Sequence, residues 1–259
     1  MAELDANIEV TREGKGPALV LLHCLGVDRH FWDFAAPLGS DFTVLRYDLP
    51  GHGTSAVPNS AYSIDDLADQ LAAILKSQKI EHVSVAGISL GGLIAQNFAA
   101  RYSKLVDRLI LVDTTPRYTD EMRGMWAERA ATARGKGVAV MVDALLKIWF
   151  SSEALTENPP GVRYVCDTLS SANGEGYALA CEALAAADLR ELLPRINART
   201  LVICGDDDIP SFLDAARWLS SNINNSELRW LAGTRHASVL EKPRDAVEIM
   251  NTFLKSALT

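Results

Sequence analysis

The sequence lacks the features of several protein classes. Its 259 residues contain only four cysteines, and none of them forms a C-x-x-C pair. Cysteines scattered in this way predict free thiols, with no disulfide and no metal centre. No stretch reaches 18 apolar residues, so we expect no membrane span. Residues 1–5 are acidic and contain no apolar signal-peptide core, which leads us to expect a cytoplasmic protein.

Positive charge is also scarce. The 25 Lys and Arg residues are outnumbered by 33 Asp and Glu residues, and the formal net charge is −8. No basic run occurs, which argues against a nucleic-acid or anionic-membrane partner. The remaining composition, 48% hydrophobic and 22% charged residues, is ordinary for a globular protein. The length suits one α/β domain with an insertion.

The most informative stretch, residues 82–95, contains the pattern Gly-x-Ser-x-Gly. Its first half is β-branched and apolar, which predicts a buried strand, and its second half is alanine-rich with helical spacing. Glycines on both sides of Ser89 allow a strand to turn at once into a helix, with the serine strained at the apex. The pattern alone arises by chance in many chains. The flanking strand and helix favour a nucleophile elbow with Ser89 as the nucleophile.

Apolar strand segments alternate with helical segments along most of the chain. This alternation predicts an α/β fold with a mostly parallel sheet and helices on both of its faces. The alternation is interrupted at residues 117–190, where the pattern is helical and no strand is expected. We therefore predict a core of residues 1–116 and 191–259, and a helical cap, or lid, of residues 117–190. Besides the strand of the elbow, strands are expected at residues 7–12, 18–23, 42–47, 105–112, 200–204 and 227–231.

A serine nucleophile needs a base, a group that orients the base, and donors for the oxyanion. Among the five histidines, His236 follows the last predicted strand and comes after the serine, so we choose it as the base. The acid is expected among Asp206, Asp207 and Asp208, which directly follow a predicted strand. Spacing in the sequence does not show which of these three carboxylates faces the histidine. Asp113, also at a strand end, is a less favoured alternative that would otherwise cap a loop or helix.

Two backbone N–H groups are expected to hold the oxyanion. One belongs to Leu90, directly after the nucleophile, and the other to Leu25, in the loop after the strand at 18–23. On its own, the stretch 23–26 is equally compatible with a plain turn. Together with the elbow it favours the oxyanion role.

These residues together resemble the α/β-hydrolase superfamily over the whole chain, and within it the 3-oxoadipate enol-lactonases. The resemblance rests on residues 25–32, 45–53, 87–92, 176–183 and 187–190. In such enzymes the triad acid lies three residues after the glycine of a G-x-x-D stretch, which maps to Asp208. The resemblance therefore implies a catalytic triad of Ser89, Asp208 and His236.

The predicted cap departs from the lactonase pattern at one position. Where these enzymes have an arginine before a tryptophan, this chain has Ile148 before Trp149. We expect Lys147 to supply a point charge for the substrate, without the bidentate geometry of arginine. Trp149 and Trp32 are expected either to wall the substrate pocket or to pack in the core.

The sequence thus predicts a serine hydrolase that cleaves a small carboxylic ester or lactone through an acyl-enzyme. We expect no cofactor and no metal, and the only partner expected is the small-molecule substrate. Two alternatives stay open. The same fold could carry out C–C bond hydrolysis or perhydrolysis, or it could bind a ligand as a receptor without catalysis. The residues do not specify the natural substrate, its acyl size or the oligomeric state.

Overall fold

The computed structural model describes Leu4 and residues 8–256, so Asn7 of the first predicted strand and most of residues 1–5, the stretch examined for a signal peptide, lie outside it. Within the described part, strands form one sheet in the order β1-β3-β2-β4-β5-β6-β7. β1 is antiparallel to β3, and the other neighbours are parallel. This confirms the predicted fold class. The strands are β1 (Val10–Gly14), β2 (Ala18–Leu22), β3 (Thr43–Tyr47), β4 (Val83–Ile88), β5 (Val106–Val112), β6 (Arg199–Gly205) and β7 (Ser226–Leu231).

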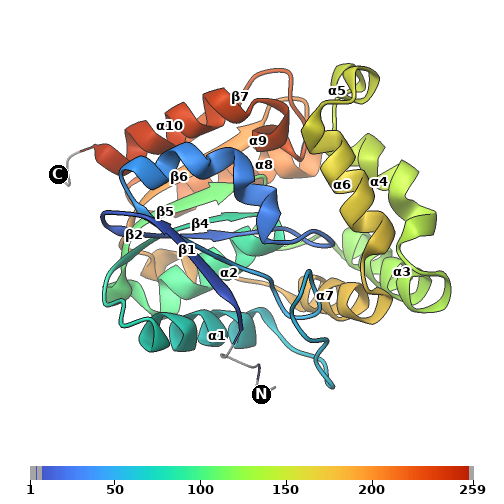
Figure 1. The fold of residues 1–259 in the computed structure, drawn as a ribbon, viewed down its shortest axis with the longest axis horizontal. Helices are drawn as coiled ribbons and strands as arrows, with labels where there is room; N and C mark the ends of the chain where they lie inside the picture. Colours follow the sequence, from blue (N-terminus) through green and yellow to red (C-terminus); the bar gives the residue numbers. More distant parts are fainter. Residues whose placement is uncertain (1–3, 5–7, 257–259) are drawn as a thin grey trace.

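Helices cover both faces of the sheet, which explains why its central strands are almost continuously apolar. On one face lie α1 (Ile64–Ser77) and α2 (Leu90–Arg101); on the other lie the 3-10 helix η1 (Arg29–Ser40) and α10 (Pro243–Lys255) (Figure 1). α8 (Pro210–Asn222) packs against β6 and β7. The edge strand β7 is only half-buried and correspondingly more polar.

The start of α1 shows how the sequence sets an element boundary. The Ser63 hydroxyl accepts a hydrogen bond from the N–H of Asp66, and the carboxylate of Asp66 accepts one from the N–H of Ser63. This capping box satisfies two N–H groups that the helix leaves without partners.

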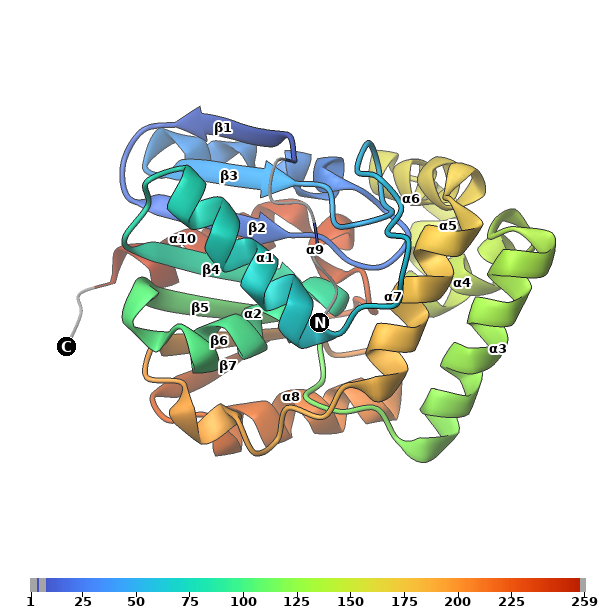
Figure 2. The same cartoon turned by 90° about the horizontal axis from the view of Figure 1, so that it is seen from below.

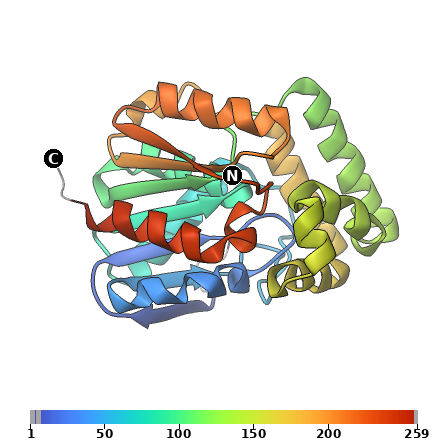
Figure 3. The ribbon, with the colours of Figure 1, turned by 90° about the horizontal axis from the view of Figure 1, so that it is seen from above.

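A block of helices lies between β5 and β6 in the chain. It comprises α3 (Asp120–Lys136), α4 (Val142–Trp149), α5 (Ser152–Glu157), α6 (Pro160–Ser171) and α7 (Gly174–Ala186). We call residues 117–190 the cap. The arrow of β3 points toward it, so the cap lies at the carboxyl ends of the parallel strands (Figure 2). The opposite view shows the same arrangement, with the cap beyond one end of the sheet (Figure 3).

The cap differs in detail from the predicted helices. Within the stretch predicted as helical, residues 139–149 consist of the 3-10 turn η3 (Ala139–Met141) followed directly by α4. Helix α3 ends where Gly137 adopts a φ of 80°, a conformation that favours glycine. Short elements complete the fold: η2 (Ser103–Leu105), η4 (Leu193–Arg195) and α9 (Ser238–Glu241). None of the helices in the described part of the chain has the length and apolarity to span a bilayer.

Candidate active site

Ser89 occupies the sharp turn between β4 and α2. Its backbone has φ 50° and ψ −111°, a strained conformation for a residue with a side chain. The surrounding structure holds this conformation in place. The N–H of Ser89 donates to the carbonyl of Val112 at 3.0 Å, and the Thr114 hydroxyl donates to the carbonyl of Ser89 at 2.8 Å. The turn is therefore fixed by the neighbouring strand β5 and the segment that follows it.

The glycines of the elbow are required by close backbone contacts. A Cβ on Gly87 would lie 2.1 Å from the carbonyl oxygen of Gly91, and one on Gly91 would lie 2.3 Å from that of Leu22. Real Cβ atoms do not approach so closely. The pattern Gly-x-Ser-x-Gly thus reflects a strand and a helix that meet with no room for side chains at these two positions.

The imidazole of His236 lies between a hydroxyl and a carboxylate. Its Nε2 atom is 3.1 Å from Oγ of Ser89, and its Nδ1 atom is 3.0 Å from Oδ2 of Asp208. With Nδ1–H donating to Asp208, Nε2 is free to accept the hydrogen bond from the serine hydroxyl. The structure therefore brings together the three residues that the sequence predicts as a triad.

The three adjacent aspartates face different ways. Asp208 is 4% exposed, and its second oxygen accepts the N–H of Ile209. Asp206 is exposed and accepts the N–H of Gly233. Asp207 is exposed and lies 3.8 Å from the guanidinium of Arg235. Of these three carboxylates, Asp208 is the one that contacts the imidazole.

Asp113, the alternative acid, lies fully buried at the end of β5. One of its oxygens accepts the N–H of Gly205, and the other accepts the hydroxyl and N–H of Ser238. Gly205 precedes the aspartate cluster, and Ser238 lies two residues after His236. Asp113 therefore holds the two loops that carry the acid and the imidazole, and its oxygens bind Gly205 and Ser238.

Burial and charge determine protonation at this site. Burial by itself would lower the pKa of His236, but the charge of Asp208 and the hydrogen bond to it raise this pKa above its ordinary value. Burial raises the pKa of Asp113, and the nearby charge of Asp208 raises it further. Asp208 thus favours the protonated form of both neighbours, which is what an imidazole needs in order to take up a proton.

The expected oxyanion donors belong to the start of α2, directly after Ser89, and to the loop that follows β2. Within the described residues, neither the N–H of Leu25 nor that of Leu90 donates to a protein acceptor. His23 supports the Leu25 loop, since its Nδ1–H donates to the carbonyl of Cys24 and its Nε2 accepts the N–H of Leu49. Burial lowers the pKa of His23 to about 4, so this ring stays neutral at neutral pH. These two hydrogen bonds indicate that His23 stabilises the loop.

Trp149 lies against the base. Its ring is 6.1 Å from that of His236 in an edge-on arrangement, and its carbonyl accepts the N–H of Ala237. Trp149 is thus buried and in contact with the base, which is compatible with either of the two roles expected for it.

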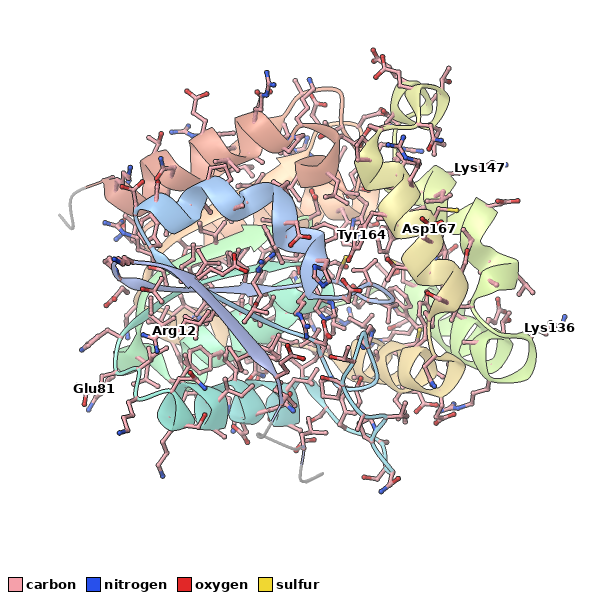
Figure 4. The ribbon with its side chains drawn as sticks, viewed as in Figure 1. Arg12, Glu81, Lys136, Lys147, Tyr164 and Asp167 are labelled. Carbon is pink, nitrogen blue, oxygen red and sulfur yellow. The ribbon has the colours of Figure 1, made fainter. Side chains whose placement is uncertain are left out.

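The other two candidates for the pocket lie elsewhere. Trp32 is fully buried in η1 against the rings of Phe31 and Phe34, as a core residue would be. Lys147 lies on the exposed side of α4, and its side chain points outward at the edge of the cap (Figure 4). The structure does not bring the ammonium group of Lys147 to the triad, because the helix turns it toward solvent.

Two aromatic side chains at the site were not found from the sequence. The ring of Phe212, from the first turn of α8, lies 4.3 Å from that of His236. Tyr118, at the start of the cap, is 1% exposed, and its hydroxyl faces the side chain of Ser89. Only the position of each residue shortly after a strand end could have indicated its role.

One buried group of side chains has the composition of a metal site. Ligand atoms of Asp113, Cys204 and Asp208 lie within 4.8 Å of one another. The carboxylate oxygens, however, already accept hydrogen bonds, and burial raises the pKa of the Cys204 thiol. This donor set suits a hydrogen-bonded support for the triad better than a cation.

The comparison with known families agrees with this geometry. The family model described as the alpha/beta hydrolase fold matches residues 17–243. This chain belongs to the α/β hydrolase family. The α/β hydrolase fold places a serine elbow, an acid and a histidine at the carboxyl ends of the strands, where Ser89, Asp208 and His236 lie.

Similar α/β hydrolases include enzymes that open lactones or cleave esters. The chain is 31% identical to 3-oxoadipate enol-lactonase 2 of Acinetobacter baylyi, over 88% of this chain and 85% of that protein. It is 32% identical to the pimeloyl-[acyl-carrier protein] methyl ester esterase of Chromobacterium violaceum, over 96% and 99% of the two chains. The crystal structure of the enol-lactonase from Burkholderia xenovorans superposes with a TM-score of 0.92, at 31% identity and 96% coverage of both chains. The predicted resemblance to enol-lactonases is confirmed, and these relatives support a hydrolase.

Proposed function

We propose that this α/β hydrolase cleaves a small carboxylic ester or lactone by serine catalysis through an acyl-enzyme. The observation that carries the proposal is the bridging position of His236, 3.1 Å from the hydroxyl of Ser89 and 3.0 Å from the carboxylate of Asp208. The N–H groups of Leu25 and Leu90, which donate to no protein acceptor within the described residues, add support.

The reaction follows from the direction of these hydrogen bonds. Oγ of Ser89 attacks the substrate carbonyl while Nε2 of His236 takes the hydroxyl proton. Asp208 keeps the imidazole in the required tautomer and stabilises the cation. The imidazolium then protonates the departing alkoxide or enolate oxygen, and the C–O bond breaks. Water, deprotonated by the same Nε2, attacks the acyl-enzyme and releases the carboxylic acid and the free serine.

Charge develops on the carbonyl oxygen during both attacks. The N–H groups of Leu25 and Leu90 are fixed donors for this oxyanion, since each is held by a rigid loop or helix start. In comparable enzymes one such donor contributes about 3 kcal/mol to the stability of the transition state.

The similarity to 3-oxoadipate enol-lactonases supports an enol-lactone as the specific substrate. In a lactone the leaving oxygen remains tethered to the acyl group, so ring opening gives an acyl-enzyme that carries the enol or ketone. The identity to a methyl ester esterase supports open esters as substrates of the same site.

A substrate panel tests the proposal. The purified chain should hydrolyse 3-oxoadipate enol-lactone or short p-nitrophenyl esters, and Ser89→Ala should fold normally and lose this turnover. Turnover of a meta-cleavage diketone alone would instead favour C–C bond hydrolysis, and activity in a perhydrolysis assay alone would favour perhydrolysis. No turnover of any of them would favour a ligand-binding receptor. Undiminished ester hydrolysis by Ser89→Ala would overturn the assignment of the nucleophile.

A further inference from the structure

A buried tyrosine at the start of the cap has a hydroxyl that its surroundings do not satisfy. Tyr118 is fully buried, and its hydroxyl faces the side chain of Ser89. Within the described part of the chain this hydroxyl makes no well-aligned hydrogen bond. Buried polar groups are seldom left in this state in native proteins, and a phenylalanine would fill the same space without the cost. The place of the hydroxyl beside the nucleophile points to a role in the reaction.

The segment that carries Tyr118 is fixed by contacts of its backbone and of its neighbours. The Thr114 hydroxyl donates to the carbonyl of Ser89 at 2.8 Å, and the carbonyl of Pro116 accepts the N–H of Leu189 at 2.9 Å. These bonds tie the segment to the elbow at one end and to the last part of the cap at the other. The phenol is thus held near the serine without using its own hydroxyl, which stays available as a preorganised donor.

The ring of Tyr118 lies on the same side of Ser89 as the imidazole. It contacts the ring of Phe212 edge-on at 6.4 Å, and Phe212 lies 4.3 Å from the ring of His236. In the sheet, β5 and β6, which precede Tyr118 and Phe212, lie on one side of β4, whereas β2, which precedes the Leu25 loop, lies on the other. The phenol and the Leu25 loop therefore approach the serine from opposite sides.

The two oxygens of a reacting ester need donors in different places. Under the proposed function the carbonyl oxygen lies at the N–H groups of Leu25 and Leu90. The leaving oxygen must lie within reach of Nε2 of His236, which supplies its proton. A donor on the imidazole side suits the leaving oxygen and not the oxyanion. Burial raises the pKa of Tyr118, so the phenol keeps its proton at neutral pH and remains a donor.

We propose that Tyr118 is a catalytic residue whose hydroxyl donates a hydrogen bond to the leaving oxygen of the ester or lactone. The inference rests on the proposed function, because it concerns the bond that breaks in the same reaction. As the C–O bond breaks, its electron pair stays on the leaving oxygen, and the imidazolium of His236 supplies the proton. Tyr118 stabilises the charge on this oxygen and keeps its own proton. When water replaces the leaving group, the same hydroxyl orients it for attack on the acyl-enzyme.

Aryl acetates that differ only in the leaving phenol test this contact. Phenoxide is more basic than p-nitrophenoxide and concentrates its charge on the oxygen, so its departure depends more on a donor. For Tyr118→Phe we expect kcat/KM for phenyl acetate to fall by about 10- to 100-fold, since a hydrogen bond to a charged oxygen is lost. For p-nitrophenyl acetate kcat/KM should fall by about threefold or less, since little charge on the oxygen remains to be stabilised.

Tyr47→Phe is the matched control. Tyr47 is also fully buried, and its hydroxyl likewise has no partner among the described residues, but it lies on β3, which β2 separates from the elbow strand β4. This variant should change neither value. The proposal is overturned if Tyr118→Phe lowers kcat/KM equally for both esters, as a structural role or an oxyanion contact would, or if it lowers neither.

A second variant changes the donor while keeping its hydroxyl. A tyrosine with one fluorine ortho to the hydroxyl, incorporated in place of Tyr118, is a stronger hydrogen-bond donor of nearly the same size. With it, kcat/KM for phenyl acetate should rise relative to that for p-nitrophenyl acetate, opposite to the change in Tyr118→Phe. This variant decides the question if Tyr118→Phe fails to fold. An unchanged ratio, or a change in the other direction, would overturn the proposal.

Labelling with a fluorophosphonate separates this proposal from the proposed function. The probe modifies an activated serine, and its fluoride leaving group is a weaker base than phenoxide. Ser89 in Tyr118→Phe should therefore be labelled within about threefold of the wild-type rate. A loss of labelling as large as the loss of phenyl acetate hydrolysis would indicate that Tyr118 acts on the serine itself, which overturns the inference and leaves the proposed function intact. A wild-type protein that is not labelled would contradict both.

Discussion

The carboxylate of Asp113 accepts a hydrogen bond from the hydroxyl of Ser238 at 2.6 Å, and this contact joins the end of β5 to the loop that carries His236. The other oxygen of Asp113 holds the N–H of Gly205, at the start of the loop that carries Asp208. Two buried carboxylates thus have separate tasks. Asp208 faces the imidazole, whereas Asp113 fixes the two loops relative to each other.

This division predicts unequal effects for the two Asp→Asn substitutions. Asp208→Asn should lower kcat by about 10⁴-fold, because an amide facing Nδ1 favours the wrong tautomer of the imidazole. Asp113→Asn keeps an acceptor for the N–H of Gly205 and should cost about tenfold or less. Ester hydrolysis by both variants, with circular dichroism to check folding, distinguishes the roles. A loss in Asp113→Asn as large as that in Asp208→Asn would make Asp113 the triad acid.

The pH dependence of hydrolysis should reflect the environment of His236. The base acts only when neutral, so activity falls as the pH drops through its pKa. Asp208 raises this pKa above the ordinary 6.5, and the midpoint of the acid limb of kcat/KM should therefore lie above that value.

Removing the charge should move this midpoint in a defined direction. In Asp208→Asn the main cause of the raised pKa of His236 is gone while burial remains, so the residual activity should persist to lower pH than in wild type. His82→Gln is the matched control, because His82 is exposed and pairs with Asp107 away from the site. An unchanged midpoint in Asp208→Asn would contradict the electrostatic account.

The elbow glycines should be intolerant of even one added carbon. Gly87→Ala would place a Cβ 2.1 Å from a backbone oxygen that has no room to move, so we expect it to lower the free energy of unfolding by more than about 3 kcal/mol. Gly124→Ala provides the control, since no atom lies within 4 Å of its added Cβ on α3. It should raise stability by about 0.5–1 kcal/mol through helix propensity. Chemical denaturation measures both, and equal stabilities would contradict the packing argument.

Residues whose roles follow from local pattern could be predicted from the sequence. Ser89 is fixed by the glycines around it, and His236 by its place after the last strand. The capping box of Ser63 and Asp66 at the start of α1 is equally local. In each case the determining contacts lie within a few residues, or at strand ends that a parallel sheet brings together.

Other features depend on contacts between distant segments. Spacing could not choose among the three adjacent aspartates, because the backbone turn after β6 decides which one faces the imidazole. The exposed position of Lys147 follows from how α4 lies on the cap. No local pattern in the sequence encodes these tertiary contacts.

Covalent labelling tests the central claim, an activated serine at the elbow, most directly. A fluorophosphonate reacts with a serine only when a base and oxyanion donors activate its hydroxyl. After incubation with the probe, mass spectrometry of peptides should find one modification per chain, on Ser89, and none in His236→Ala. Absence of labelling in the folded wild-type protein, or labelling at another residue with Ser89 unmodified, would contradict the account.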